Sequence, residues 1–244
     1  MTTKKVIDIS QFNNVTNWEK VKATGYPVII RIGYRGSKTG VITYDPKYKE
    51  YRAACEKYGI EHSFYFFPCS ITNAEAHEEA QFVINEVKDC KLNMPIFWDS
   101  EVVQRDKSGR SDKLSREKRT EMLSILCDKL LAAGIPCGVY ASRSWLYNNL
   151  DMSKIAAPAE YNTWVAEYGV SQNKYYGNQV LWQYTSSGSV NGIDGRVDLS
   201  RIMKQFNMDA LNIEQPGQKE EPKPIEKSEW EKVLEIAKAE LGYL

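Results

Sequence analysis

The stretch from residue 28 to residue 67 decides the fold class. It opens with VIIRIGY (residues 28–34), continues with DPKYKEYRAACEKYG (residues 45–59) and closes with SFYFF (residues 63–67). The first and last parts are short, apolar and rich in β-branched or aromatic residues, which is typical of buried strands. The middle part predicts a helix that begins with Asp45 as N-cap and Pro46 in the first turn, and ends at Gly59. The apolar face of this helix is formed by Tyr48, Tyr51, Cys55 and Tyr58.

The alternation of strand and helix recurs on both sides of this stretch. The other strands are expected at residues 6–10, 95–99, 138–141, 163–168, 180–184 and 196–199. The other helices are expected at residues 17–24, around residues 76–87, from about residue 122 to residue 134, and after the strand at residues 138–141 as far as residue 149. Five strand–helix units followed by three strands predict an α/β fold, an irregular TIM-like barrel, with a doubly wound open sheet as the alternative.

The composition excludes several classes of function. Thirty-two Lys and Arg residues balance thirty-two Asp and Glu residues in a chain of 244, so no extended basic face for nucleic acid or anionic lipid is expected. Five cysteines without a CxxC pair indicate reduced, buried thiols rather than a disulfide framework. Because the chain has only two histidines, we expect no histidine-rich metal site, and we predict no cofactor.

The two ends of the sequence carry separate expectations. The first residues lack the apolar run of a signal peptide and no later run has transmembrane length, so we expect no membrane insertion and synthesis in the host cytoplasm, with action outside only after release. A first domain is expected at residues 1–210 and a Pro-punctuated, polar linker at residues 211–227. Residues 228–244 predict a helix, which either begins a truncated second module or contacts the first domain or a second copy of the chain.

The candidate chemistry begins at Asp99 and Glu101, at the end of the strand expected at residues 95–99. Residues i and i+2 of a strand project from the same face, about 6.5–7 Å apart, and the carboxyl ends of barrel strands surround the catalytic mouth. Two neighbouring carboxyl groups disfavour joint ionisation, so that one keeps its proton while the other stays charged. Glycoside hydrolysis requires that division of roles, although an isolated Asp-x-Glu pair is more often a solvated turn.

Other residues at expected strand ends point to the same mouth. Asp8 ends the first strand and Asp198 lies in the last, so both are candidates for a carboxylate-lined cleft; otherwise each is an ordinary cap or hydrogen-bond acceptor. Aromatic rings in such a cleft pack against the apolar faces of pyranose sugars, although a single ring is more often part of the core. The candidates for substrate binding are Tyr34, Tyr65, Tyr140, Trp164 and Gln183.

Several motifs occur together in a fixed order. They are VIDIS (residues 6–10), VIIRIGY (28–34), the pair Asp99-x-Glu101, GVY (138–140), WVAEY (164–168) and WQYTSSGSVNGIDGRVDL (182–199), of which the last is the most specific. From residue 5 to about residue 205 the chain resembles glycoside hydrolase family 25, the Chalaropsis-type lysozymes, and especially the phage endolysins of that family. The resemblance implies a barrel of five β/α units followed by three strands.

The resemblance also implies an activity, which is hydrolysis of the β-1,4 bond between N-acetylmuramic acid and N-acetylglucosamine in peptidoglycan, without metal or cofactor. Glu101 matches the general acid/base of the family. Asp99 matches its partner, which either attacks the anomeric carbon or steadies the acetamido group of the substrate. Asp8 and Asp198 match two supporting acids. Three aromatic positions that line the sugar cleft are matched by Tyr65, Tyr140 and Trp164.

The sequence departs from the family pattern at Phe66, where histidine is common, and at Trp98, where an aliphatic residue is common. Both departures predict an altered subsite and leave the carboxylates in place. The charged run at residues 105–119 is expected to be a solvated loop and helix start beside the cleft.

The leading hypothesis is a retaining muramidase of a phage or prophage, and the alternative is a wall-glycan-binding module without turnover. The presence of all four acids favours the enzyme.

Overall fold

The structure, a computed structural model, describes residues 4–104, 106–155 and 163–204. The linker expected at residues 211–227 and the helix expected at residues 228–244 lie outside the described residues. None of the helices in the described ranges combines the length and the apolar character needed to cross a membrane. All five cysteines of the chain lie in the described part, where they are buried and unpaired, as the sequence predicts.

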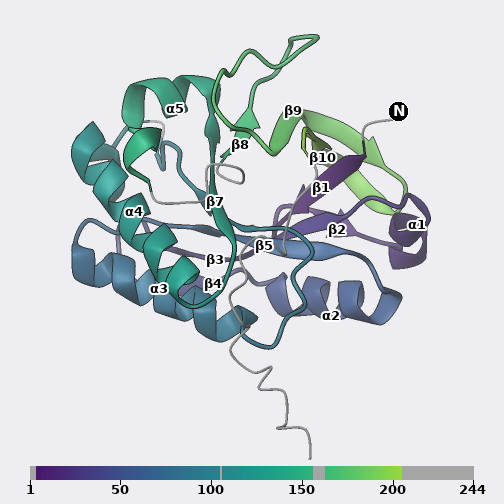
Figure 1. Cartoon of the computed structure of the whole chain (residues 1–244). Helices are drawn as coiled ribbons and strands as arrows, with labels where there is room; N and C mark the ends of the chain where they lie inside the picture. The colour runs from purple at the N-terminus through teal and green to yellow at the C-terminus, as the bar shows by residue number, and fades with distance from the viewer. Residues whose placement is uncertain (1–3, 105, 156–162, 205–244) are drawn as a thin grey trace, which may run out of the picture. The chain divides into compact units, whose positions relative to one another are not determined.

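The described part of the chain forms a closed barrel of eight strands with helices outside it (Figure 1). Strand β1 pairs with β3 on one side and with β10 on the other, which closes the ring. The pairs from β1–β3 round to β8–β9 are parallel, whereas β9–β10 and β10–β1 are antiparallel, so the predicted irregular TIM-like barrel is confirmed. The barrel strands are β1 (Lys5–Ile9), β3 (Val28–Arg35), β5 (His62–Phe67), β6 (Ile96–Asp99), β7 (Cys137–Ser142), β8 (Thr163–Ala166), β9 (Leu181–Val190) and β10 (Ile193–Ile202).

The helices cover the outer face of the barrel, where α3 and α4 lie side by side (Figure 1). Their apolar faces and the outward side chains of the strands form one large core. A second, smaller cluster of buried residues includes Phe97 and Trp164, and Tyr65 and Tyr140 pack against it. The helices are α1 (Trp18–Ala23), α2 (Tyr48–Tyr58), α3 (Asn73–Val87), α4 (Arg116–Ala132) and α5 (Arg143–Asn149), and the 3₁₀ helices are η1 (Arg110–Lys113) and η2 (Met152–Lys154).

The start of α2 differs from the sequence prediction. The helix begins at Tyr48 with Lys47 as N-cap, and not at Asp45-Pro46. Asp45 instead pairs with Arg31 of β3 at 2.7 Å and accepts hydrogen bonds from the backbone N–H of Gln11 and of Lys47. The carboxylate is buried, so it requires these partners, and they draw Asp45 away from the end of the helix.

Three further differences concern strands. The short strands β2 (Asn14–Val15) and β4 (Ile42–Tyr44) were not predicted, because each is a marginal pairing at the edge of the barrel. Strands β9 and β10 are ten residues each, longer than the predicted segments, and form a hairpin that turns at Asn191-Gly192. Gly192 has a φ of 93°, and a Cβ there would lie 2.2 Å from the backbone oxygen of Asn17, so this turn requires glycine.

Candidate active site

The four predicted acids come together in one open cleft of about 470 Å³ at the carboxyl ends of the barrel strands. Asp8 lies in β1 and Asp198 in β10, while Asp99 is the last residue of β6 and Glu101 follows two positions later. These residues are up to 190 positions apart in the sequence, and the closed barrel brings them together. The cleft is also lined by Ser10, Phe12, Asn13, Arg31, Tyr65, Phe67, Tyr140, Trp164, Gln183 and Arg196.

Asp99 lies at the floor of the cleft and is almost completely buried. Burial raises its pKa well above the ordinary value, and the nearby charge of Glu101 raises it further, whereas the guanidinium of Arg31 opposes the shift. No group in the described part of the chain donates a hydrogen bond to its buried Oδ1 atom. A buried carboxyl oxygen without a partner points to a role toward a bound molecule.

Glu101 is exposed to solvent, unlike Asp99. Its pKa is nevertheless raised, first because the walls of the cleft displace water from around its carboxyl group, and second because the charge of Asp198 faces it. An exposed carboxyl group that retains its proton above the ordinary pKa is suited to donate that proton to a substrate atom.

Asp8 and Asp198 stand directly opposite each other in the antiparallel pair of β1 and β10. Burial raises the pKa of both groups, and for Asp8 the charge of Asp198 raises it further. Two carboxyl groups placed face to face disfavour joint ionisation, so the pair retains a proton above the ordinary pKa of aspartate. The pair therefore carries less negative charge than two separate carboxylates.

Gln183 orients Asp8 within this pair. Its Nε2 group donates to both carboxyl oxygens of Asp8, at 3.1 and 3.2 Å. Its Oε1 atom accepts hydrogen bonds from the hydroxyl of Tyr140, at 2.8 Å, and from that of Tyr168. Burial raises the pKa of both tyrosines, so the hydroxyls remain protonated donors. Two donors at Oε1 leave Nε2 as the only end of the amide that faces Asp8.

The predicted aromatic residues form the floor of the cleft around Trp164. The ring of Tyr140 lies 4.6 Å from that of Trp164, and the ring of Tyr65 lies 6.4 Å from it, both edge to face. Trp164 is itself held by a hydrogen bond of 2.9 Å from Nε1 to the hydroxyl of Ser200. Tyr34 is not among the residues that line the cleft; its ring lies 5.6 Å from the guanidinium of Arg31.

Sequence reasoning missed Arg31 and Phe12. The guanidinium of Arg31 pairs with Asp45 and lies 5.1 Å from the ring of Phe12. Its positive charge acts to lower the pKa of Asp99. Phe12 is 79% exposed, so its ring is open to the cleft. The signal for Arg31 was present, because an arginine inside the apolar run VIIRIGY requires a buried partner. The loop position of Phe12 gave no periodic signal.

A closed β/α barrel with neighbouring carboxyl groups at its mouth is an arrangement typical of glycoside hydrolases. The sequence profile of the family described as glycosyl hydrolases family 25 matches residues 7–193, which is most of the chain. The chain belongs to this family.

Three similar proteins span a range of relatedness. A curated relative named autolytic lysozyme, from Clostridium acetobutylicum, is 27% identical over 215 residues, which is 88% of this chain and 60% of the relative. The modular autolysin LytC from Streptococcus pneumoniae, solved in complex with a synthetic peptidoglycan ligand, has a TM-score of 0.69 and 28% identity, covering 82% of this chain and 46% of that chain. The catalytic domain of endolysin ply40, from bacteriophage P40 of Listeria monocytogenes, has a TM-score of 0.65 and 22% identity, covering 86% of this chain and 96% of that domain. This last likeness shows the fold alone.

Proposed function

We propose that the chain hydrolyses the β-1,4 bond between N-acetylmuramic acid and N-acetylglucosamine in peptidoglycan, with retention of configuration, and so lyses bacterial walls. The main support for the proposal is the position of Asp99 and Glu101, which lie two residues apart at the end of β6 and both line the cleft of a family 25 barrel. The name of the Clostridium relative and the peptidoglycan ligand of LytC support the choice of substrate. The chain spans about 60% of the length of that curated relative.

In the proposed first step, Glu101 protonates the oxygen of the glycosidic bond as the bond to the anomeric carbon breaks. Asp99 acts on the opposite side of the sugar, where it either attacks the anomeric carbon or steadies the acetamido group of the substrate as that group attacks. In the second step a water molecule, deprotonated by Glu101, replaces the attacking group. Glu101 regains its proton in this step, and two inversions leave the configuration unchanged.

The remaining cleft residues have supporting roles in this proposal. The proton retained by the pair of Asp8 and Asp198 limits the negative charge near Asp99 and Glu101, while it leaves enough to stabilise a positively charged sugar in the transition state. The exposed ring of Phe12 and the edges of Tyr65 and Tyr140 offer apolar surface to the faces of the sugars. No step in this scheme requires a metal or a cofactor.

The test of the bond and of the stereochemistry is product analysis. Purified peptidoglycan is digested with the chain, the new ends are reduced with borohydride, and the fragments are identified by mass spectrometry. The proposal predicts reduced N-acetylmuramic acid at every new end. Proton NMR in the first minutes of a digest of soluble glycan is expected to show the β-anomer before the α-anomer. Reduced N-acetylglucosamine would contradict the proposed bond, and initial α-anomer would contradict retention.

We also propose that residues 1–210 act as the catalytic domain of a phage-type wall lysin, and that residues 211–227 link it to a further contact. The helix expected at residues 228–244 begins a second module or joins two copies of the chain. The mass in solution of the chain with and without residues 228–244 distinguishes the two. A dimer that the deletion converts to a monomer supports the contact between copies, and a monomer in both cases rules that contact out.

A further inference from the structure

Glu101 lies beyond the end of its strand, so the sheet does not hold it. Strand β6 ends at Asp99. The residue before Glu101, Ser100, is fixed by its backbone N–H, which donates to the backbone oxygen of Tyr140 at 2.8 Å. The hydroxyl of Ser100 also accepts a hydrogen bond of 3.1 Å from Nε1 of Trp145. The position of Glu101 therefore depends on what holds the segment that follows it.

The carboxylate of Asp112 holds the segment that follows Glu101. Asp112 accepts hydrogen bonds from the backbone N–H of Val103 at 2.8 Å, of Gln104 at 3.1 Å and of Gly109 at 3.0 Å. A Cβ at Gly109 would lie 2.6 Å from Oδ2 of Asp112, so the carboxylate packs directly on the glycine backbone. Three N–H donors on one carboxylate form a compact, charge-assisted arrangement, and its first member lies two residues after Glu101.

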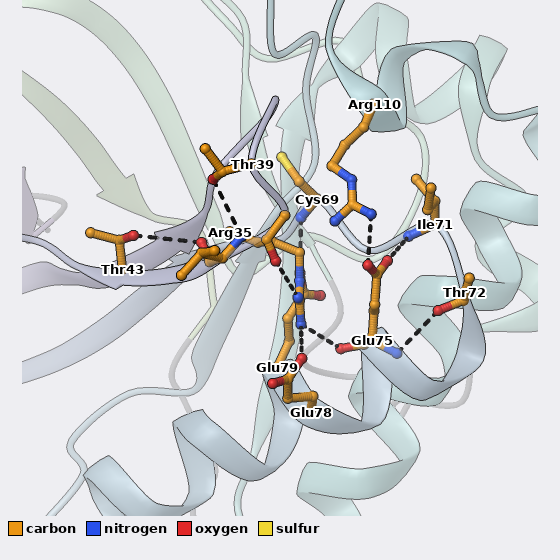
Figure 2. Close-up of polar contacts among 12 residues, drawn as sticks. Arg35, Thr39, Thr43, Cys69, Ile71, Thr72, Glu75, Glu78, Glu79 and Arg110 are labelled. Carbon is orange, nitrogen blue, oxygen red and sulfur yellow. Dashed lines mark hydrogen bonds and ion pairs between the residues drawn. The ribbon is translucent and has the colours of Figure 1, made fainter.

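Arg110 ties the same loop to helix α3 (Figure 2). Its Nη2 atom pairs with Oε1 of Glu75 at 2.6 Å, and its backbone N–H donates to the backbone oxygen of Ser37 at 3.0 Å. The other carboxyl oxygen of Glu75 accepts from the backbone N–H of Ile71 at 2.9 Å. Burial alone raises the pKa of Glu75, but the hydrogen bonds from Ile71 and Arg110 outweigh burial, so its pKa is lowered and the group stays charged.

Helix α3, which carries Glu75, is held to the barrel by a buried ion pair, shown in Figure 2. Arg35 of β3 pairs with Glu79 of α3 at 2.7 Å, and both side chains are almost fully buried. Arg35 also donates to the backbone oxygens of Glu75, at 3.1 Å, and of Gly40, at 2.6 Å. Glu79 accepts in addition from the backbone N–H of Cys69, at 3.0 Å. Helix α3 is thus locked to the barrel at the point where Arg110 binds.

We propose that Asp112 and Arg110 are positioning residues for Glu101, which hold the loop at residues 102–104 and 106–110 so that the carboxyl group of Glu101 stays against the cleft. Neither residue lines the cleft, so each acts through the backbone of the loop and not on the substrate. The inference rests on the proposed function, because it assumes that Glu101 is the proton donor. It assigns a role to a charged segment that the sequence predicts to be merely solvated.

The test is Asp112→Ala, assayed on soluble glycan beside Asp151→Ala. Asp151 is a matched control, since its carboxylate also accepts from a backbone N–H in a turn, that of Ser153, and it is not among the residues that line the cleft. We expect Asp112→Ala to lower kcat roughly 10- to 100-fold, the effect of misplacing a catalytic group by about 1 Å, with little change in KM. We expect Asp151→Ala to leave both constants unchanged.

The pH profile separates positioning from general loss of structure. The charged groups that line the cleft with Glu101 are Asp8 (β1), Arg31 (β3), Asp99 (β6), and Arg196 and Asp198 (β10). If the loop loosens, Glu101 moves away from Asp198 and into water, so the alkaline limb of kcat/KM is expected to move to lower pH in Asp112→Ala. Loss of folded protein alone would lower the amplitude at every pH and leave the limb in place.

Arg110 provides the second variant, which carries the test if Asp112→Ala does not fold. We expect Arg110→Ala to lower kcat in the same sense and Arg110→Lys to restore part of the loss, because lysine keeps the charge beside Glu75. A kcat of either alanine variant equal to that of the wild type, with wild-type melting temperature, would overturn the inference. An inactive wild type would instead overturn the proposed function, so the two failures are distinguishable.

Discussion

Replacing Gln183 with methionine tests how the cleft holds its acids. The two side chains are similar in length and volume, so the change removes hydrogen bonds without opening a large cavity. Gln183 is almost fully buried, donates to Asp8 and accepts from Tyr140 and Tyr168. Methionine can do none of these, so Asp8 loses its donor and the buried hydroxyl of Tyr140 loses its acceptor.

The expected loss of stability follows from those contacts. Because the pKa of Asp8 is raised, its hydrogen bond with Gln183 is counted as one between neutral groups, which contributes about 0.5–1.5 kcal/mol, and leaving a buried hydroxyl without an acceptor costs about 1–3 kcal/mol. Tyr168 is 47% exposed, so its hydroxyl finds water and adds little. The sum predicts that Gln183→Met lowers the free energy of unfolding by about 1.5–4.5 kcal/mol.

Urea unfolding at pH 7, followed by far-UV circular dichroism, measures this loss. Gln81→Met is the control, since Gln81 is exposed on α3 and its side chain donates to Asn85 of the same helix; its change is expected to stay within about 0.5 kcal/mol. A loss below about 1 kcal/mol for Gln183→Met would show that the amide does not hold Asp8 and Tyr140 in the way described.

Three further predictions concern the cleft. Because burial and the charge of Asp198 raise the pKa of Asp8, the stability that this group contributes is complete below about pH 3.9 and is lost as the pH rises through the folded pKa. Asp8→Asn is therefore expected to melt at a higher temperature than the wild type at pH 7, with little difference near about pH 3; a lower melting temperature at pH 7 contradicts this. Since Asp198 raises the pKa of Glu101, Asp198→Asn is expected to move the alkaline limb of kcat/KM to lower pH, and a shift to higher pH contradicts it. Phe12→Ala is expected to raise KM about 3- to 10-fold with kcat nearly unchanged, in line with the loss of one stacking contact, and an unchanged KM on soluble glycan removes Phe12 from the substrate surface.

Much of the barrel was predictable because its strands are short apolar runs separated by helical patterns. That pattern also placed Asp99 and Glu101 correctly, since the end of a barrel strand faces the mouth whatever the sequence beyond it. The face-to-face pairing of Asp8 with Asp198 was not predictable in register, because it depends on β10 running antiparallel to β1 across almost the whole chain. The periodicity of a sequence reflects neighbouring residues, so it does not predict the register between two strands this far apart.

The missed residues share a different cause. The neighbouring residues predict Asp45 as a helix cap. In the structure its carboxylate pairs with the buried guanidinium of Arg31, and the helix begins at Tyr48. Asp112 and Arg110 lie in a charged run that is typical of a solvated loop. The folded loop directs three backbone N–H groups at the carboxylate of Asp112 and places Arg110 against Glu75. A loop of this kind has no repeat, so its contacts follow from the fold and not from the local sequence.

Reducing-end release from purified peptidoglycan by the wild type and by Glu101→Gln tests whether Glu101 is the proton donor of a glycan-cleaving enzyme. We expect steady release by the wild type and a rate lower by roughly 10²- to 10⁴-fold for the variant, with both proteins still binding the walls. Equal release by the two proteins would contradict the role of Glu101. Binding without release by either protein would make the chain a wall-binding module and not an enzyme.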